Sequence, residues 1–259
     1  MRLLFCGLIL LPALTFAQSD QPATADRDRV LKAAADFARD YIDRLPDFVC
    51  QRVTQHNTRK SPADTWKPQV KVAEELTFYS RKEHYRIVAI NDTPATKMPR
   101  LGSWVGSSGD FGEFLHALFD PKSRAVFEWK GRETIRDRRV WTFSYRSPAG
   151  YGITDCKSVL IVGTCKTHEY PYHGTVSVLD DPLQIVRLTV EPDNVPQNQE
   201  SRSTDYDRVT IAGSEYLLPI ADTFERVRDK MYFRNESVYR DYRKFGSEST
   251  IKAIPDGLR

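Results

Sequence analysis

From Phe48 onward, apolar and polar side chains alternate with a period of two residues in repeated short runs. In such a run successive side chains point to opposite faces of a strand, so each strand has one apolar face and one polar face. Short polar segments separate the runs, as turns between antiparallel strands do. The clearest runs lie at 70–78, 84–90, 125–130 and 141–145. The alternation therefore predicts an antiparallel sheet with one buried face.

Two segments instead show the helical spacing of three or four residues. Apolar residues recur at that spacing from 26 to 45, which predicts one long amphipathic helix. A second, shorter helix is expected before Pro121. Its N-terminus is predicted at Ser107-Ser108-Gly109-Asp110, because Glu113 stands three residues after Asp110 as in a capping box.

The number and order of these elements predict the fold class. About ten strands, two helices and short connections are typical of a mainly β chain of the α+β class. Successive hairpins favour a single antiparallel sheet in meander order, with the helices packed on its concave face. Because no period of 20–50 residues repeats, a propeller or a solenoid is excluded. We expect residues 26–259 to form a single β domain.

The N-terminus indicates export. Residues 1–17 have the composition of a secretory signal peptide, with Arg2 followed by an apolar run that ends at Ala17. The run is too short to span a bilayer, and residues 18–25 form a polar leader after it. The alternatives are an uncleaved N-terminal anchor and a lipoprotein acylated on Cys6. The expected location is periplasmic or secreted, peripheral to a membrane at most.

The charge balance argues against a nucleic-acid partner. The chain has 38 Lys and Arg residues and 35 Asp and Glu residues, a formal net charge of +3. Opposite charges are also interspersed, as where Asp137 precedes Arg138 and Arg139. This pattern is typical of a solvated surface and not of a cationic nucleic-acid patch.

Three cysteines lie outside the signal segment: Cys50, Cys156 and Cys165. An oxidising compartment favours a disulfide, and the short separation of Cys156 and Cys165 makes them the expected pair. Cys50 then remains, either as a buried inert thiol in an apolar strand or as a partner in an intermolecular disulfide.

No arrangement of nucleophiles, acids or metal ligands is convincing. Ser108 lacks the glycine two residues later that a nucleophile elbow needs, because Asp110 stands there. Cys165, His168 and His173 match no closed zinc site, and strand alternation places the two histidines on opposite faces. We therefore expect no catalytic residue, no bound metal, no cofactor and no enzymatic turnover.

The order of elements carries a resemblance to a known family. A leader, an amphipathic helix, antiparallel strands interrupted by a second helix and closing hairpins such as 174–182 and 215–219 resemble the lipoprotein-carrier (LolA/LolB/RseB-like) superfamily. That superfamily includes the periplasmic carrier of outer-membrane lipoproteins and the periplasmic regulator of an envelope-stress anti-sigma factor. Leu45-Pro-Asp-Phe-Val-Cys50 and Phe119-Asp-Pro-Lys-Ser123 are also similar to segments of uncharacterised exported proteins of acidobacteria.

The resemblance implies an incomplete β-barrel around helices, with a concave apolar face that binds lipid or lipoprotein acyl chains. No site residue of the family can be assigned to a position of this sequence. The candidate ligand-binding residues are instead aromatic and apolar residues of the middle strands and the second helix. They are Phe111, Phe114, Leu115, Leu118, Phe119, Phe127, Trp129, Trp141 and Phe143. The same residues can equally pack as ordinary core. The chain is then an envelope sensor or protein-interaction module whose partner docks on an edge strand; a hydrolase is the third alternative.

The signal peptide predicts that the mature protein begins at Gln18, because small or short side chains at Thr15 and Ala17 suit the cleavage enzyme. Intact-mass measurement of protein from the envelope checks this. A chain that retains Met1, or that carries diacylglycerol on Cys6, contradicts it.

Overall fold

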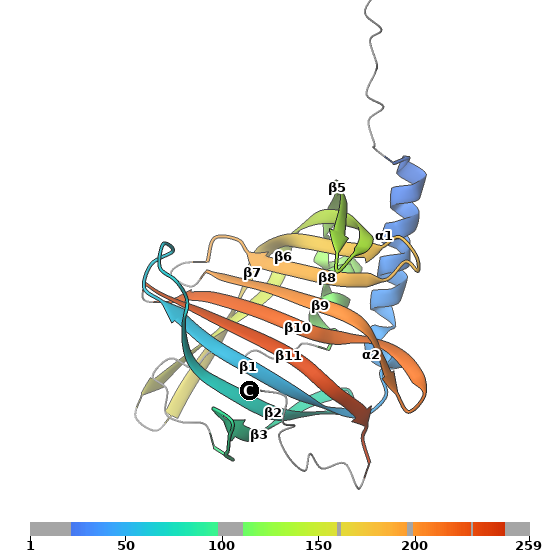
Figure 1. Ribbon diagram of the computed structural model, residues 1–259. Helices are drawn as coiled ribbons and strands as arrows, with labels where there is room; N and C mark the ends of the chain where they lie inside the picture. Colours follow the sequence, from blue (N-terminus) through green and yellow to red (C-terminus); the bar gives the residue numbers. More distant parts are fainter. Residues whose placement is uncertain (1–21, 98–110, 160–161, 196–198, 229, 247–259) are drawn as a thin grey trace, which may run out of the picture.

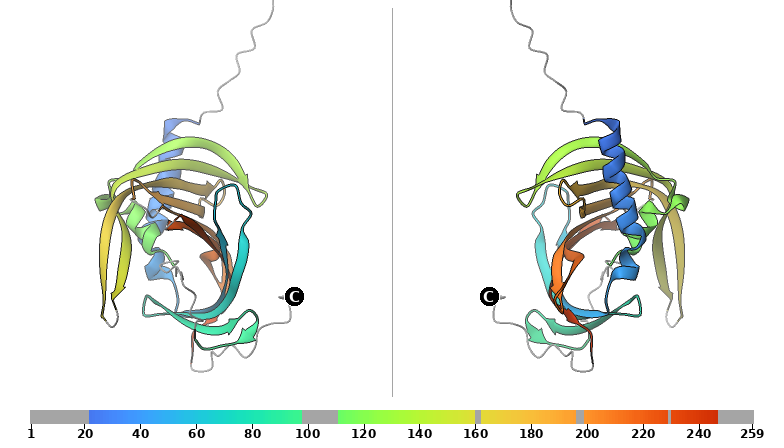
Figure 2. Two further views of the ribbon diagram at one scale, coloured as in Figure 1. Left: turned by 90° about the vertical axis from the view of Figure 1, so that its left-hand side faces the viewer. Right: turned by 90° about the vertical axis from the view of Figure 1, so that its right-hand side faces the viewer.

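One eleven-stranded antiparallel sheet dominates the computed structural model, which describes residues 22–97, 111–159, 162–195, 199–228 and 230–246. The sheet curls around the helices, which lie on its inner side (Figures 1 and 2). The chain is mainly β, as predicted, and the curled sheet is an incomplete barrel. Within the described ranges no helix is both long enough and apolar enough to cross a membrane.

The helices and strands have the following bounds. The helices are α1 (Thr24–Arg39), α2 (Tyr41–Arg44), α3 (Glu113–Phe119) and the short 3-10 helix η1 (Pro121–Ser123). The strands are β1 (Phe48–Arg59), β2 (Lys67–Tyr79), β3 (Lys82–Ile90), β4 (Thr93–Pro94), β5 (Val126–Ile135), β6 (Arg138–Val159), β7 (Val162–Leu179), β8 (Ile185–Pro192), β9 (Glu200–Ile211), β10 (Ser214–Arg228) and β11 (Met231–Lys244).

The strand order is a meander that is interrupted once. Its order is β4-β3-β2-β1-β11-β10-β9-β8-β7-β6-β5, so the first and last strands of the chain are neighbours in the middle of the sheet. The chain runs outward from β1 to the edge strand β4, then crosses to the opposite edge at β5, and α3 lies in this crossover. Register shifts between neighbouring strands, for example at Trp129/Gly131 and Pro219/Ala221, bend the sheet as β-bulges do.

The N-terminal helix differs from the expectation. The pattern from 26 to 45 predicts one continuous helix, but the structure divides it at Asp40 into α1 and α2. Asp40 has φ −100° and ψ 4°, outside the helical range, and its carboxylate accepts a hydrogen bond from Arg44. The break turns Tyr41 into the interior, where it is buried. No helix-breaking residue marks this position in the sequence.

The second helix begins later than predicted. Residues 107–110 lie outside the described part of the chain, and Gly112, not Asp110, precedes the first helical residue Glu113. Gly112 has φ +95°, and a Cβ atom there would lie 2.2 Å from Cδ1 of Tyr41. Only glycine combines this backbone conformation with so close an approach of a ring. The contact between α2 and the start of α3 therefore sets the start of the helix.

A second glycine is required by a close approach inside the sheet. Gly174 in β7 leaves space through which the hydroxyl of Tyr145 donates a hydrogen bond to the carbonyl oxygen of Thr189 in β8, at 2.5 Å. A Cβ atom at Gly174 would lie 2.0 Å from that oxygen and 2.6 Å from the Tyr145 hydroxyl. Beside it, the Thr189 hydroxyl accepts a hydrogen bond from the backbone N–H of Thr175 at 2.8 Å. The side chains of Tyr145 and Thr189 thus make hydrogen bonds at this position between β7 and β8.

The strand register brings the two expected disulfide partners together. Cys156 in β6 and Cys165 in β7 are directly opposed Cα partners near the tip of the β6–β7 hairpin. Directly opposed residues of antiparallel strands have Cα separations of ~4.5–5.5 Å, within the range that a disulfide spans. Cys50, in β1, is fully buried and free. Burial raises the pKa of the Cys50 thiol, which disfavours the reactive thiolate.

We predict that Cys156 and Cys165 form a disulfide and that Cys50 takes no part. Alkylation followed by mass spectrometry of the mature protein is expected to add no label in the native state and one in denaturant without reductant. Reduction in denaturant should expose all three thiols. The pairing is wrong if unreduced peptides link Cys50 to another cysteine, or if denaturant alone exposes all three thiols.

Candidate functional site

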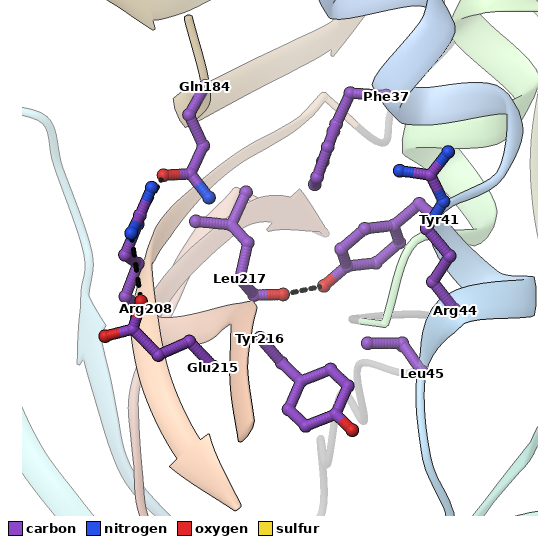
Figure 3. A pocket seen from close by; sticks show the side chains of 9 residues that line it. All are labelled: Phe37, Tyr41, Arg44, Leu45, Gln184, Arg208, Glu215, Tyr216 and Leu217. Carbon is purple, nitrogen blue, oxygen red and sulfur yellow. Dashed lines mark hydrogen bonds and ion pairs between the residues drawn. The ribbon is translucent and has the colours of Figure 1, made fainter. Parts of the chain in front are cut away.

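A pocket opens where the N-terminal helices meet the β9–β10 hairpin (Figure 3). It has a volume of about 280 Å³ and combines an apolar floor with a charged mouth. Its lining residues come from α1, α2, the end of the 180–184 turn and the paired ends of β9 and β10. They are Phe37, Tyr41, Arg44, Leu45, Gln184, Arg208, Glu215, Tyr216 and Leu217.

Tyr41 joins the floor of the pocket to the sheet. Its hydroxyl donates a hydrogen bond to the carbonyl oxygen of Leu217 in β10 at 2.8 Å (Figure 3). Its ring lies 5.3 Å from that of Phe37 and 6.3 Å, edge-on, from that of Tyr206. Burial raises the pKa of Tyr41 well above its usual value, so the hydroxyl remains a donor at physiological pH. Among the described residues, this is the hydrogen bond that ties α2 to the sheet.

Two arginines flank the mouth of the pocket. Arg208 forms an ion pair with Glu215 at 2.9 Å and donates to the side-chain oxygen of Gln184 at 3.2 Å. Arg44 pairs with Asp40 at 2.8 Å. All four charged side chains are about half exposed or more, so these pairs contribute little to folding stability. The guanidinium groups can therefore exchange their partners for a ligand without a large cost.

Beneath the pocket lies the largest apolar cluster among the described residues, called the helix-side cluster here. It fills the space between α1, α3 and the inner faces of β6–β10. Its buried members are Val30, Ala34, Ala38, Tyr41, Leu115, Leu118, Trp141, Phe143, Tyr145, Tyr172, Val176, Val178, Ile185, Leu188, Val190, Tyr206 and Leu217. Phe37 and Leu45, which line the pocket, pack against it.

The structure brings eight of the nine candidate ligand-binding residues into this cluster. Leu115, Leu118, Trp141 and Phe143 are buried members, whereas the other four pack against the cluster and are partly buried. Those four are Phe114, Phe119, Phe127 and Trp129. Their rings contact one another: Phe119 stacks on Phe127 at 5.2 Å, and Trp129 lies 5.1 Å from Trp141.

Phe111 belongs to a different cluster. It packs with Phe48 and Phe78 at the start of β1 and the end of β2, with ring centroids 5.1 and 6.1 Å away. The helix pattern placed Phe111 on the apolar face of the second helix, but it precedes Gly112 and lies outside α3. The positive φ of Gly112 turns the chain there, so Phe111 faces a separate part of the interior.

The inner face of the sheet is not apolar throughout. Toward the far ends of β1, β2, β9, β10 and β11 it carries buried charges, called the inner charged patch here. Its ion pairs join neighbouring strands: Arg52–Glu74 at 2.7 Å, Arg202–Asp222 at 2.7 Å and the close pair Arg226–Glu200. Buried charges are tolerated in a fold when they are paired, as each of these is.

Histidine and hydroxyl side chains complete the inner charged patch. His56 lies beside Asn235, with 2.7 Å between Nδ1 and the amide oxygen, and Thr54 shares a hydrogen bond with Ser237 at 2.9 Å. Burial lowers the pKa of His56 to about 4, so the ring is neutral at physiological pH. The Asp222 carboxylate also accepts from the Thr204 hydroxyl at 2.8 Å. This part of the face is therefore mainly polar, with Phe224 among its ion pairs.

Sequence reasoning found the apolar residues but not the pocket. The apolar helical pattern from 26 to 45 contains Phe37, Tyr41 and Leu45. It predicts that these residues are buried, but it does not indicate that they border a pocket. Arg208 and Glu215 carried no signal, because their proximity depends on the pairing of β9 with β10. In the described part of the chain no group of His, Cys, Asp and Glu could hold a metal ion.

Comparisons with known proteins gave two solved structures. No protein-family model and no curated protein matches the chain. A LolA superfamily protein from Nitrosomonas europaea is 10% identical, with a TM-score of 0.35, over 83% of this chain and 93% of that one. A DUF1329 family protein from Desulfovibrio piger is 14% identical, with a TM-score of 0.37, over 84% of this chain and 94% of that one.

The bond between Tyr41 and Leu217 predicts a measurable loss of stability in Tyr41→Phe. Removing the hydroxyl leaves a buried carbonyl without this donor, so the free energy of unfolding should fall by about 1 kcal/mol. Urea denaturation followed by circular dichroism measures it. Tyr216→Phe is the matched control, since it lines the same pocket and no hydrogen bond of its hydroxyl is found among the described residues. Equal stability of the two variants would contradict the assigned role.

Proposed function

We propose that the protein is an exported binding protein that holds the acyl chain of a lipid or lipoprotein against the helix-side cluster, without chemical turnover. Export rests on the signal-like residues 1–17. The observation that carries the proposal is that Phe37, Tyr41, Leu45 and Leu217 belong both to the pocket and to the helix-side cluster or its rim. The apolar interior therefore reaches the surface at the pocket, as a site for an apolar ligand requires.

The size of the pocket implies that the helices move when a long chain enters. At about 280 Å³ the pocket is at the small end of ligand sites, which usually enclose ~300–1,000 Å³. In the described part of the chain, one hydrogen bond, Tyr41 to Leu217, and one ion pair, Arg81 to Asp43, join α1 and α2 to the sheet. The remaining contact is apolar and non-directional, so an acyl chain can replace it.

The mouth of the pocket suits an anionic head group. Arg44 and Arg208 lie on opposite sides of the opening, and their partners Asp40 and Glu215 are exposed. A carboxylate or phosphate at the mouth would accept hydrogen bonds from one or both guanidinium groups while the chain lies on Phe37 and Leu217. The inner charged patch then defines the side of the interior that the acyl chain avoids.

A closed core is the second candidate, and a specific observation favours it. Leu115 and Leu118 have no exposed surface, and the aromatic rings around them are in contact. If the helix-side cluster never opens, the protein is an interaction module and its partner binds an outer surface or an edge strand. Ligand binding separates the two candidates.

A fluorescent fatty-acyl probe tests the proposal. The delipidated full-length protein should bind the probe, and Leu45→Arg should weaken binding about tenfold, as expected when contact with one or two methylene groups is lost. Leu31→Arg is the matched control, because Leu31 is a half-buried leucine on α1 that packs against the same cluster but does not line the pocket. Fluorescence titration gives the dissociation constants, and thermal melts confirm folding.

Two outcomes would contradict acyl-chain binding at this site. A folded, delipidated wild type that binds no probe would support the closed interaction module. Equal weakening by Leu31→Arg and Leu45→Arg would place the probe elsewhere on the cluster.

A further inference from the structure

The outer face of the sheet carries a larger opening than the pocket beside the helices. Two adjoining cavities of about 430 Å³ and 860 Å³ share Lys130, Ser144, His173 and Gly174 as lining residues, and together they are called the outer cleft. The outer cleft lies on the side of the sheet away from α1 and α3. This follows from the alternation in β6 and β7, where Phe143 and Val176 belong to the helix-side cluster while their neighbours Ser144 and Thr175 face outward.

A row of hydroxyl side chains crosses the outer cleft. Ser144 opposes Thr175, Thr189 opposes Ser203, and Ser203 opposes Thr223 in the register of five successive strands, β6 to β10. The hydroxyls of Thr175 and Thr189 share a hydrogen bond at 2.9 Å, which joins the two halves of the row. Neighbouring strands are ~4.8 Å apart, so the row extends over roughly 20 Å.

The hydroxyls at the β9–β10 end of the row are available to a ligand. Ser203 and Thr223 are half-buried, and within the described residues no hydrogen bond of either hydroxyl to the protein is found. The next row along the strands differs, because there Thr142 and Ser177 are buried opposite each other and Arg187 pairs with Asp205 at 2.5 Å. These two hydroxyls are thus less fully satisfied by the protein than the polar groups of the next row.

The charges of the outer cleft nearly cancel. Arg124, Lys130 and Arg146 line it together with four acidic side chains, and His173 is held by the Asp193 carboxylate at 2.7 Å. The side chain of Arg202 points to the inner face, where it pairs with Asp222. A nearly balanced lining gives no strong field that would concentrate a polyanion or a polycation. Carboxylates such as Glu191 and Glu225 accept hydrogen bonds from hydroxyl groups, and serine and threonine both donate and accept them. The lining therefore suits an uncharged ligand rich in hydroxyl groups.

We propose that the outer cleft is a binding site for an extended, uncharged oligosaccharide. Every sugar of a β-linked hexose chain carries several hydroxyl groups, so an extended chain that lies across the strands can meet successive members of the hydroxyl row. Val126, which is 65% exposed at the edge of the cleft, and Pro148 offer apolar surface to the C–H face of a sugar ring. This site is separate from the acyl-chain pocket, with which it shares no lining residue.

Calorimetric titration of the full-length protein with β-1,4-linked tetramers of glucose and of N-acetylglucosamine tests the site. The wild type should bind at least one of them, and Ser203→Ala/Thr223→Val should weaken binding at least about fivefold, as the loss of two hydrogen-bonding hydroxyls predicts. The matched control is Thr210→Val/Ser214→Ala, which removes the same two kinds of hydroxyl from exposed positions at the other ends of β9 and β10. It should bind like the wild type.

Three outcomes would overturn the proposal. The first is that the folded wild type binds neither tetramer, and the second is that the two double variants bind equally. The third is that the protein binds only a sulfated oligosaccharide, which would indicate a site for anions. Thermal melts of both variants show whether each is folded. If the cleft variant unfolds, Ser203→Tyr, which fills the cleft from a half-buried outward position, replaces it. The fatty-acyl probe should bind all of these variants equally, so failure of this site and failure of the acyl-chain pocket are distinguishable.

Discussion

The pairing of β1 with β11 is the constraint on which the rest of the fold depends. It joins the first strand of the chain to the last and places both in the middle of the sheet. Without it, β1 to β4 and β5 to β11 would be two separate sheets, each with an extra open edge. The pairing also connects the inner charged patch, because Arg52 on β1 and Asn235 on β11 face the same interior from adjacent strands.

The interior is divided by chemistry rather than by a boundary between domains. Apolar and aromatic side chains fill the region under α1 and α3, and paired charges fill the far ends of the central strands. An unpaired charge under the helices would lose its hydration without a partner to replace it. An alkyl chain among the ion pairs would likewise remove water from charged groups without replacing their hydrogen bonds. The interior is therefore polarised along the central strands, from an apolar end under the helices to a charged end.

Local patterns predicted the strands and the mainly β fold because alternation and turn residues act over a few positions. The turn at Ala212–Gly213, for example, joins β9 to β10 as its residues indicate. The break at Asp40 and the late start of α3 at Glu113 could not be predicted, since both depend on Tyr41 packing against Gly112, which is distant in sequence. The aromatic residues of the site were predicted as a group. The pocket was not, because Arg208 and Glu215 approach the helices only after the sheet has curled.

Gly174 makes the two surfaces of the sheet mutually dependent at one position. The Tyr145 ring lies in the helix-side cluster, yet its hydroxyl reaches the Thr189 carbonyl, whose side chain belongs to the hydroxyl row of the outer cleft. A displacement of the Tyr145 ring would therefore act on the backbone of β8 through this one hydrogen bond. The inner and outer surfaces of this sheet therefore cannot evolve, or be redesigned, independently of each other where that bond crosses it.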